Sequence, residues 1–158
     1  MALRVSALER ISRFDVALGP GTPSMAAVDI RVFTDLLYAG GGTVVYQPTA
    51  VIRYFQRGPV AGLRLQMFGY SVGLTAFYAS LIADRPWCVP ELIQILPVMY
   101  RDLFSSESLQ SGGLPSGLPF ELRRAKRRGM LIAPVSYFRA RLDVARLARK
   151  SESCAPTG

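Results

Sequence analysis

Two short stretches of the 158-residue chain have the composition of β-strands. They are Thr43–Tyr46 and Ala50–Phe55, which are rich in the β-branched and aromatic residues that favour strands. Two strands are too few for an independently stable sheet. The remaining pattern predicts helices over 6–11, 29–39, 59–83 and 91–104, and one or two more after residue 120. We therefore expect an α/β fragment that is mainly helical, with amphipathic helices at its C-terminal end.

Changes in composition divide the chain into segments. The strands belong to an α/β portion over residues 1–58, and an apolar helical pair follows over 59–104. A stretch rich in Ser, Gly and Pro predicts a flexible loop over 105–119. Residues 120–150 predict a basic amphipathic helical segment, and the tail over 151–158 is expected to be disordered.

The positive charge is concentrated in one part of the chain. Lys and Arg total 19, Asp and Glu total 11, and the net charge is +8. Residues 121–150 hold ten basic residues and two acidic ones, a difference equal to the whole net charge. A segment of this kind requires an anionic counterpart, such as phosphate, nucleic acid or anionic lipid.

The same segment combines its charges with regularly spaced apolar residues. Leu131, Val135, Phe138 and Leu142 recur at spacings of three and four, with arginines between them. This pattern predicts an amphipathic helix that binds an anionic membrane surface. Nucleic acid is the alternative partner, but no nucleic-acid recognition motif accompanies the basic residues. The expected membrane-binding residues are Arg123, Arg124, Lys126, Arg127, Arg128, Arg139 and Arg141.

The longest uncharged run, Leu65–Ala83, just reaches the length of a membrane span. Its glycine, hydroxyl and amide residues favour a buried helix instead, with an interfacial helix as a further alternative. Gly69 and Gly73 within it predict close packing against another helix. The N-terminus is charged and lacks the apolar core of a signal peptide, so we expect a peripheral protein on the cytoplasmic face of the membrane, or otherwise a cytoplasmic one.

Several kinds of chemistry are excluded by composition. The chain has no histidine, which rules out Ser–His and Cys–His nucleophiles and histidine-ligated metals. Two cysteines, Cys88 and Cys154, are too few for a zinc site, and no metal site is predicted. Among the carboxylates, Asp15 is interpreted as a turn residue and Asp35 as part of a solvated helix face.

The order of four stretches resembles the second half of a family-two glycosyltransferase, the inverting type with a GT-A fold. The stretches read MALRVSALERISRFDVALGPGT, AAVDIRVFTDLLYAGGGTVVYQPTAVI, RLQMFGYSVG and ELRRAKRRGMLIAPVSYFRAR. The resemblance implies that residues 1–58 are the C-terminal portion of a GT-A domain. It also implies transfer of a sugar from a nucleotide-sugar donor to an acceptor hydroxyl, with a carboxylate base and a divalent metal, Mg or Mn.

The resemblance places individual residues in this chemistry. The family's G-G-E-D element corresponds to Ala26-Ala27-Val28-Asp29, so Asp29 stands at the remnant position of the general base. Arg53, Arg57 and Arg64 are candidates for contact with a phosphate or with the acceptor, and the alternative is that they form a solvated face. The alternative role of Asp29 is that of a carboxylate that interacts favourably with the dipole of the helix it begins.

The first half of the family's pattern has no counterpart here. The chain contains no Asp-x-Asp motif and no glycine-rich phosphate loop. We therefore expect no cofactor in this chain, and little or no sugar transfer unless a separately encoded N-terminal half completes it. The alternative is a non-catalytic helical protein that binds a membrane surface or a partner.

Overall fold

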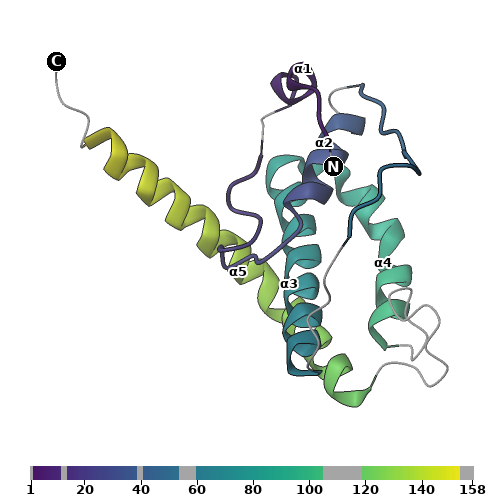
Figure 1. The fold of residues 1–158 in the computed structure, drawn as a ribbon. Coiled ribbons are helices and arrows are strands. Elements are labelled where there is room, and N and C mark those ends of the chain that lie inside the picture. The colour runs from purple at the N-terminus through teal and green to yellow at the C-terminus, as the bar shows by residue number, and fades with distance from the viewer. Residues whose placement is uncertain (1, 12–13, 39–40, 54–59, 105–118, 154–158) are drawn as a thin grey trace.

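The computed structural model describes residues 2–11, 14–38, 41–53, 60–104 and 119–153 (Figure 1). This part of the chain is mainly helical, as the sequence predicts, and contains no strand. Its elements are α1 (Val5–Glu9), α2 (Val28–Tyr38), α3 (Val60–Asp84), the 3-10 helix η1 (Pro86–Cys88), α4 (Val89–Phe104) and α5 (Phe120–Ser153).

The strand predictions were wrong for the residues that the structure describes, and residues 54 and 55 of the second predicted strand lie outside them. Residues 43–53 carry no strand, and the backbone makes a turn in which the Ala50 N–H donates to the carbonyl of Gln47 at 3.1 Å. Val45, Tyr46, Val51 and Ile52 are exposed. A strand needs a neighbouring backbone for its hydrogen bonds, and the described residues supply none. Composition favoured strands here, but composition alone cannot provide the pairing.

Helices α3 and α5 form the centre of the fold and run side by side over much of α3 (Figure 1). Val72, Ala76 and Ser80 are buried on α3 at spacings of four residues. The buried residues of α5 lie on one side of the helix and comprise Leu122, Ala125, Lys126, Met130, Ala133, Tyr137 and Ala140. Small residues on both helices let the two backbones approach closely.

Helix α5 is one continuous helix that passes through Pro134 and ends at Ser153. The C-terminal end of α5 projects beyond the other helices (Figure 1). Residues 151–153 are helical, which corrects the prediction that disorder begins at 151. The predicted loop at 105–119 lies outside the described residues, except for residue 119, and so does the tail over 154–158.

The N-terminal segment packs onto the α3–α5 pair. Ala17 and Leu18 form one buried cluster with Ala76, Tyr137 and Ala140. A second cluster joins α1 to α2 and comprises Ile11, Val32 and Leu36. A third joins the start of α2 to α3 and comprises Ala27, Phe77 and Leu81. Residues 14–38 therefore share a core with α3 and α5.

One helix of the described part is long and apolar enough to cross a membrane. It spans Gly62–Asp84 within α3, and 44% of its most apolar window is buried inside the protein. A buried core helix of a soluble protein passes the same test. Contacts with α5 bury part of this helix, and the choice between a buried helix and a span stays a prediction.

Glycines on α3 and α5 mark where the chain packs most closely. A Cβ on Gly73 would lie 2.6 Å from Ala26 Cβ, and a Cβ on Gly129 would lie 2.7 Å from the carbonyl oxygen of Phe68. Gly73 therefore packs against the segment before α2 rather than against a helix. Gly129 is the residue that brings α5 against α3.

We predict that Gly129→Ala lowers the free energy of unfolding by about 1–3 kcal/mol, because the new methyl group meets backbone that cannot move independently. Gly69→Ala is the matched control, since its Cβ would lie 3.5 Å from the flexible Met25 side chain. Alanine in mid-helix stabilises by about 0.5–1 kcal/mol relative to glycine. Urea denaturation of the two variants measures both effects, and an equal response would contradict the close α3–α5 contact.

Candidate functional site

The side of α5 opposite its buried face carries a regular exposed stripe. We call it the outer stripe, and its spacing of three and four residues places all its members on one side of the helix. It comprises Arg124, Arg128, Leu131, Val135, Phe138, Leu142, Arg146 and Arg149. The four apolar members have exposed fractions of 81%, 70%, 52% and 59% in chain order. The outer stripe is therefore an apolar patch with a pair of arginines at each end.

The dimensions of the outer stripe follow from helix geometry. At a rise of 1.5 Å per residue, the apolar part from Leu131 to Leu142 is about 16 Å long. Arginine side chains can lay their methylene groups along an apolar surface while the guanidinium groups stay in a polar layer. An apolar centre between arginines suits a helix that lies flat in the interface of a bilayer.

The structure separates the predicted membrane-binding residues into two groups. Arg124, Arg127, Arg128, Arg139 and Arg141 are exposed. Arg123 is half-buried, and its Nε has no hydrogen-bond partner among the described residues.

Lys126 corrects the prediction, because it is 2% exposed. It lies four residues after Leu122 and seven before Ala133, both buried, so it falls on the face of α5 that meets α3. The prediction counted its charge without assigning its face. Lys126 therefore cannot contribute its charge to an outside surface.

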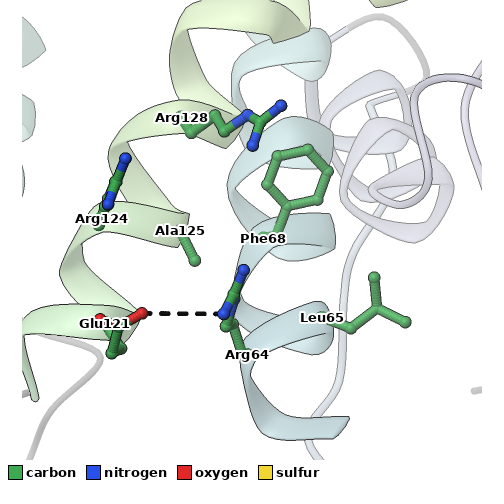
Figure 2. Close-up of a pocket in the computed structure, with 7 residues that line it drawn as sticks. All are labelled: Arg64, Leu65, Phe68, Glu121, Arg124, Ala125 and Arg128. Atoms are coloured by element: carbon green, nitrogen blue, oxygen red, sulfur yellow. Dashed lines mark ion pairs between the residues drawn. The ribbon is translucent and has the colours of Figure 1, made fainter. Parts of the chain in front are cut away.

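A basic groove lies between the start of α3 and the start of α5 (Figure 2). Its volume is about 700 Å³. Arg64 Nη1 is 3.7 Å from Glu121 Oε2, and both side chains are largely exposed. Figure 2 shows Arg128 extending from α5 toward the α3 side. The lining residues are Arg64, Leu65, Phe68, Glu121, Arg124, Ala125 and Arg128.

The groove is lined by one of the arginines predicted to contact a phosphate and by two of those predicted to bind a membrane. Arg64 lies there with Arg124 and Arg128. Arg53 is exposed on the segment before α3 and does not line the groove. Arg57 lies outside the described residues. The expected set of three phosphate contacts is therefore represented in the groove by Arg64.

Asp29, the remnant base position, lies in the first turn of α2 and is exposed. Its Oδ1 accepts a hydrogen bond from the Ile30 N–H at 2.9 Å. Ala27, two residues before Asp29, has a φ of +83°, a left-handed conformation that glycine adopts more easily. Asp29 is not among the residues that line the basic groove.

A buried ion network that the sequence pattern did not predict joins α2 to α3. Arg31 Nε is 2.9 Å from Asp35 Oδ2, and Arg31 Nη2 is 2.9 Å from Asp84 Oδ2. Arg31 Nη1 donates a hydrogen bond to Ser80 Oγ at 2.8 Å. Burial acts to lower the pKa of Arg31, but the two carboxylates outweigh it and raise that pKa. Asp35 is therefore a buried partner of Arg31 and not part of a solvated face.

Two further arginines extend the network to the residue before η1 and to α5. Asp35 Oδ1 lies 2.8 Å from Arg85 Nη2, an ion pair without hydrogen-bond geometry. Asp84 Oδ1 lies 2.8 Å from Arg141 Nη1. Of these contacts, the sequence indicates only the pair of Arg31 and Asp35, because these residues lie four positions apart on one helix. The network fixes α2 and α5 against the end of α3.

Tyr137 links α5 to the N-terminal segment through its hydroxyl group, which lies 3.2 Å from Asp15 Oδ2. Asp15 also accepts a hydrogen bond from the Ala17 N–H at 3.0 Å, as expected of a turn residue. Burial, reinforced by the nearby carboxylates of Asp15 and Asp84, raises the pKa of Tyr137 to about 12. The folded protein therefore holds this proton more tightly than the unfolded chain does.

This raised pKa predicts a loss of stability in alkali. The contribution of Tyr137 is fully present below pH 10, its usual pKa, and is lost as the pH rises to about 12. We expect the free energy of unfolding to fall by about 1–2 kcal/mol more in the native chain than in Tyr137→Phe over this range. Denaturation at stepped pH measures the difference, and parallel curves for the two proteins would contradict the assignment.

Comparison with known proteins found no matching family model, no matching curated protein and no matching solved structure. Among the described residues, no group of three or more potential metal ligands was found.

Proposed function

We propose that this chain is a peripheral membrane protein that binds anionic bilayers through the outer stripe of α5. The observation that carries the proposal is the exposure of four large apolar side chains on one side of a helix, between two pairs of arginines. In a soluble protein that binds no partner, a basic amphipathic helix is expected to pack its apolar side against the protein core. Here the inward face of α5 is made of other residues, so the outer stripe remains available.

The energetics favour a membrane over the alternative partners. Burying a large apolar side chain fully contributes about 1.5–3 kcal/mol, and each basic residue near an anionic surface contributes about 1 kcal/mol. A bilayer interface offers both an apolar layer and anionic headgroups. Nucleic acid would engage the arginines but would leave Leu131, Val135 and Phe138 in water. The proposed location is the cytoplasmic face of the cell membrane.

Vesicle co-sedimentation tests this proposal. Vesicles of phosphatidylcholine with 30% phosphatidylserine, on the order of physiological charge, are compared with phosphatidylcholine alone. We expect strong binding to the anionic vesicles that weakens, but does not vanish, in high salt, because salt screens the arginines and leaves the apolar contact. Equal binding to both vesicles, or none, contradicts the proposal. Binding to duplex DNA with a steep salt dependence, and none to vesicles, would favour nucleic acid instead.

A second candidate is an incomplete glycosyltransferase-like protein. The observation that favours it is the left-handed backbone of Ala27, at a position where the resembling G-G-E-D element has glycine. Asp29 is exposed at the start of α2, where a base could meet an acceptor hydroxyl. The exposed residues at 43–53 have strand composition and could pair with strands from a separately encoded N-terminal half. A nucleotide-sugar donor, and Mg or Mn, would bind only to the completed protein.

This second candidate predicts that the chain alone neither binds nor transfers a UDP- or GDP-linked hexose. Equilibrium dialysis with and without Mn measures binding. Tight, metal-dependent binding by the chain alone would contradict incompleteness. If co-expression with a partner restores transfer, Asp29→Asn should abolish it, and unchanged transfer in that variant would exclude Asp29 as the base.

A further inference from the structure

We propose that the basic groove between α3 and α5 is a binding site for a phosphomonoester group, carried by a lipid headgroup. This inference rests on the proposed membrane binding in one respect, because Arg124 and Arg128 belong both to the groove and to the outer stripe. The groove itself is defined independently by its position and its lining. Its volume of about 700 Å³ lies within the range of small-ligand sites, about 300–1,000 Å³.

The charge of the groove favours a multiply charged anion. Three arginines line it, Arg64, Arg124 and Arg128, and Glu121 is the one acidic residue among the described residues of the lining. No ion pair of Arg124 or Arg128 is found within the described ranges, and the one pair of Arg64 is long at 3.7 Å. At least two arginines therefore retain their full capacity to bind an anion from solution.

The shape of guanidinium groups further restricts the class of anion that the groove can bind. Each guanidinium presents a planar fork of N–H donors that matches two oxygens of a phosphate. A carboxylate has two oxygens and one charge, which a single arginine satisfies. A phosphomonoester has three terminal oxygens and a charge near −2, so it can bind several arginines at once. Three arginines around one groove thus suit a terminal phosphate better than a carboxylate headgroup.

The remaining lining residues indicate that the phosphate belongs to a lipid. Leu65, Phe68 and Ala125 form the apolar part of the wall. A free phosphate would leave this wall unused, whereas the glycerol and upper acyl carbons of a lipid can cover it. Because Arg128 is followed on the outer stripe by Leu131, the groove adjoins the end of the apolar patch. A lipid that enters from the bilayer would meet the groove and the outer stripe together.

Vesicle binding with two headgroups tests the site. Phosphatidic acid supplies a phosphomonoester, and phosphatidylserine supplies a phosphodiester with a carboxylate, at mole fractions that give equal surface charge. We expect the native chain to bind phosphatidic acid vesicles about tenfold more tightly, a ratio typical of one strong charge-assisted contact. Equal affinity for the two vesicles would overturn the proposed specificity.

Three variants assign the effect to the groove. Arg64→Gln, which lies outside the outer stripe, should weaken phosphatidic acid binding about tenfold and phosphatidylserine binding about twofold or less. Glu121→Gln should strengthen phosphatidic acid binding about two- to threefold, because it removes a carboxylate that repels the phosphate from the lining. Arg10→Gln removes one exposed charge from the C-cap of α1, outside the groove, and should change neither the affinity for phosphatidic acid vesicles nor that for phosphatidylserine vesicles. An Arg64→Gln response equal to that of Arg10→Gln would overturn the site.

A soluble probe separates this inference from the proposed function. Glycerol 3-phosphate is titrated against the protein without vesicles, and the Arg64→Gln variant is titrated alongside. If glycerol 3-phosphate binds weakly and Arg64→Gln abolishes this binding, the result supports the groove. Failure of the native chain to bind phosphatidylserine vesicles would contradict membrane docking but would leave the groove supported. Binding of glycerol 3-phosphate as tight as that of phosphatidic acid vesicles would overturn the lipid source and assign a soluble phosphate. No response to the soluble probe or to phosphatidic acid would overturn the site.

Discussion

Replacing Arg31 with alanine lowers the free energy of unfolding by about 3–5 kcal/mol, the range expected when one partner of a buried ion pair is removed. Arg31 is buried and reaches Asp35, Asp84 and Ser80 through three different nitrogens. Its loss leaves Asp35 buried with the ion pair to Arg85 as its one remaining ionic partner among the described residues. Urea denaturation followed by circular dichroism measures the effect.

Arg10→Ala provides the matched control for this prediction. Arg10 is an exposed arginine, and exposed substitutions of this kind change stability by about 0.5 kcal/mol or less. If the free energy of unfolding of Arg31→Ala lies within 1 kcal/mol of that of Arg10→Ala, a difference on the order of a weak surface ion pair, the network does not hold α2 against α3. A variant too unstable to purify would agree with the prediction, and Arg31→Lys, which keeps the charge but loses the fork, should then give an intermediate and measurable loss.

The largest effect on binding is expected from the double variant Leu131→Asn plus Phe138→Asn. Both side chains are exposed, so the free energy of unfolding should change by about 0.5 kcal/mol or less. Burial of the two apolar groups in a bilayer contributes about 3–6 kcal/mol, so affinity for anionic vesicles should fall at least about a hundredfold. Co-sedimentation over a series of lipid concentrations measures this loss.

The matched control for the outer stripe is Val51→Asn plus Ile52→Asn. These residues are also apolar and exposed, but they lie on the segment before α3. The control should leave vesicle affinity within about twofold of the native chain, a difference of less than 0.5 kcal/mol. If both double variants lose affinity equally, binding depends on general surface hydrophobicity and the outer stripe has no special role.

The sequence predicted the helices well because their signals are local. The periodic apolar residues of α2 and α5 and the long apolar run of α3 lie within each segment, and glycine and proline mark the ends of several helices. The strand predictions over 43–46 and 50–53 were wrong because strand pairing depends on a second backbone that no local signal supplies. The apolar and basic pattern of the outer stripe was predicted, since Leu131, Val135, Phe138 and Leu142 are spaced on one side of a helix. That this side is the exposed one became clear only from the packing of α5 on α3.

The parts of the site that the sequence missed all depend on long-range contacts. Arg64 meets Arg124 and Arg128 only because α3 and α5 pack with their starts together. Lys126 is buried because the interface with α3 falls on its side of α5. The pairing of Arg31 with Asp84 likewise requires the two helices to be placed before the partners can be identified.

The most direct test of membrane docking is the environment of residue 138 on vesicles. In a Trp87→Phe chain, Phe138→Trp places a single tryptophan at the centre of the outer stripe. On anionic vesicles, its emission should shift to the blue and be quenched by lipids brominated on their acyl chains, because the ring enters the upper acyl region. Emission that keeps its solvent wavelength and escapes quenching while the protein sediments with the vesicles would contradict docking through the outer stripe.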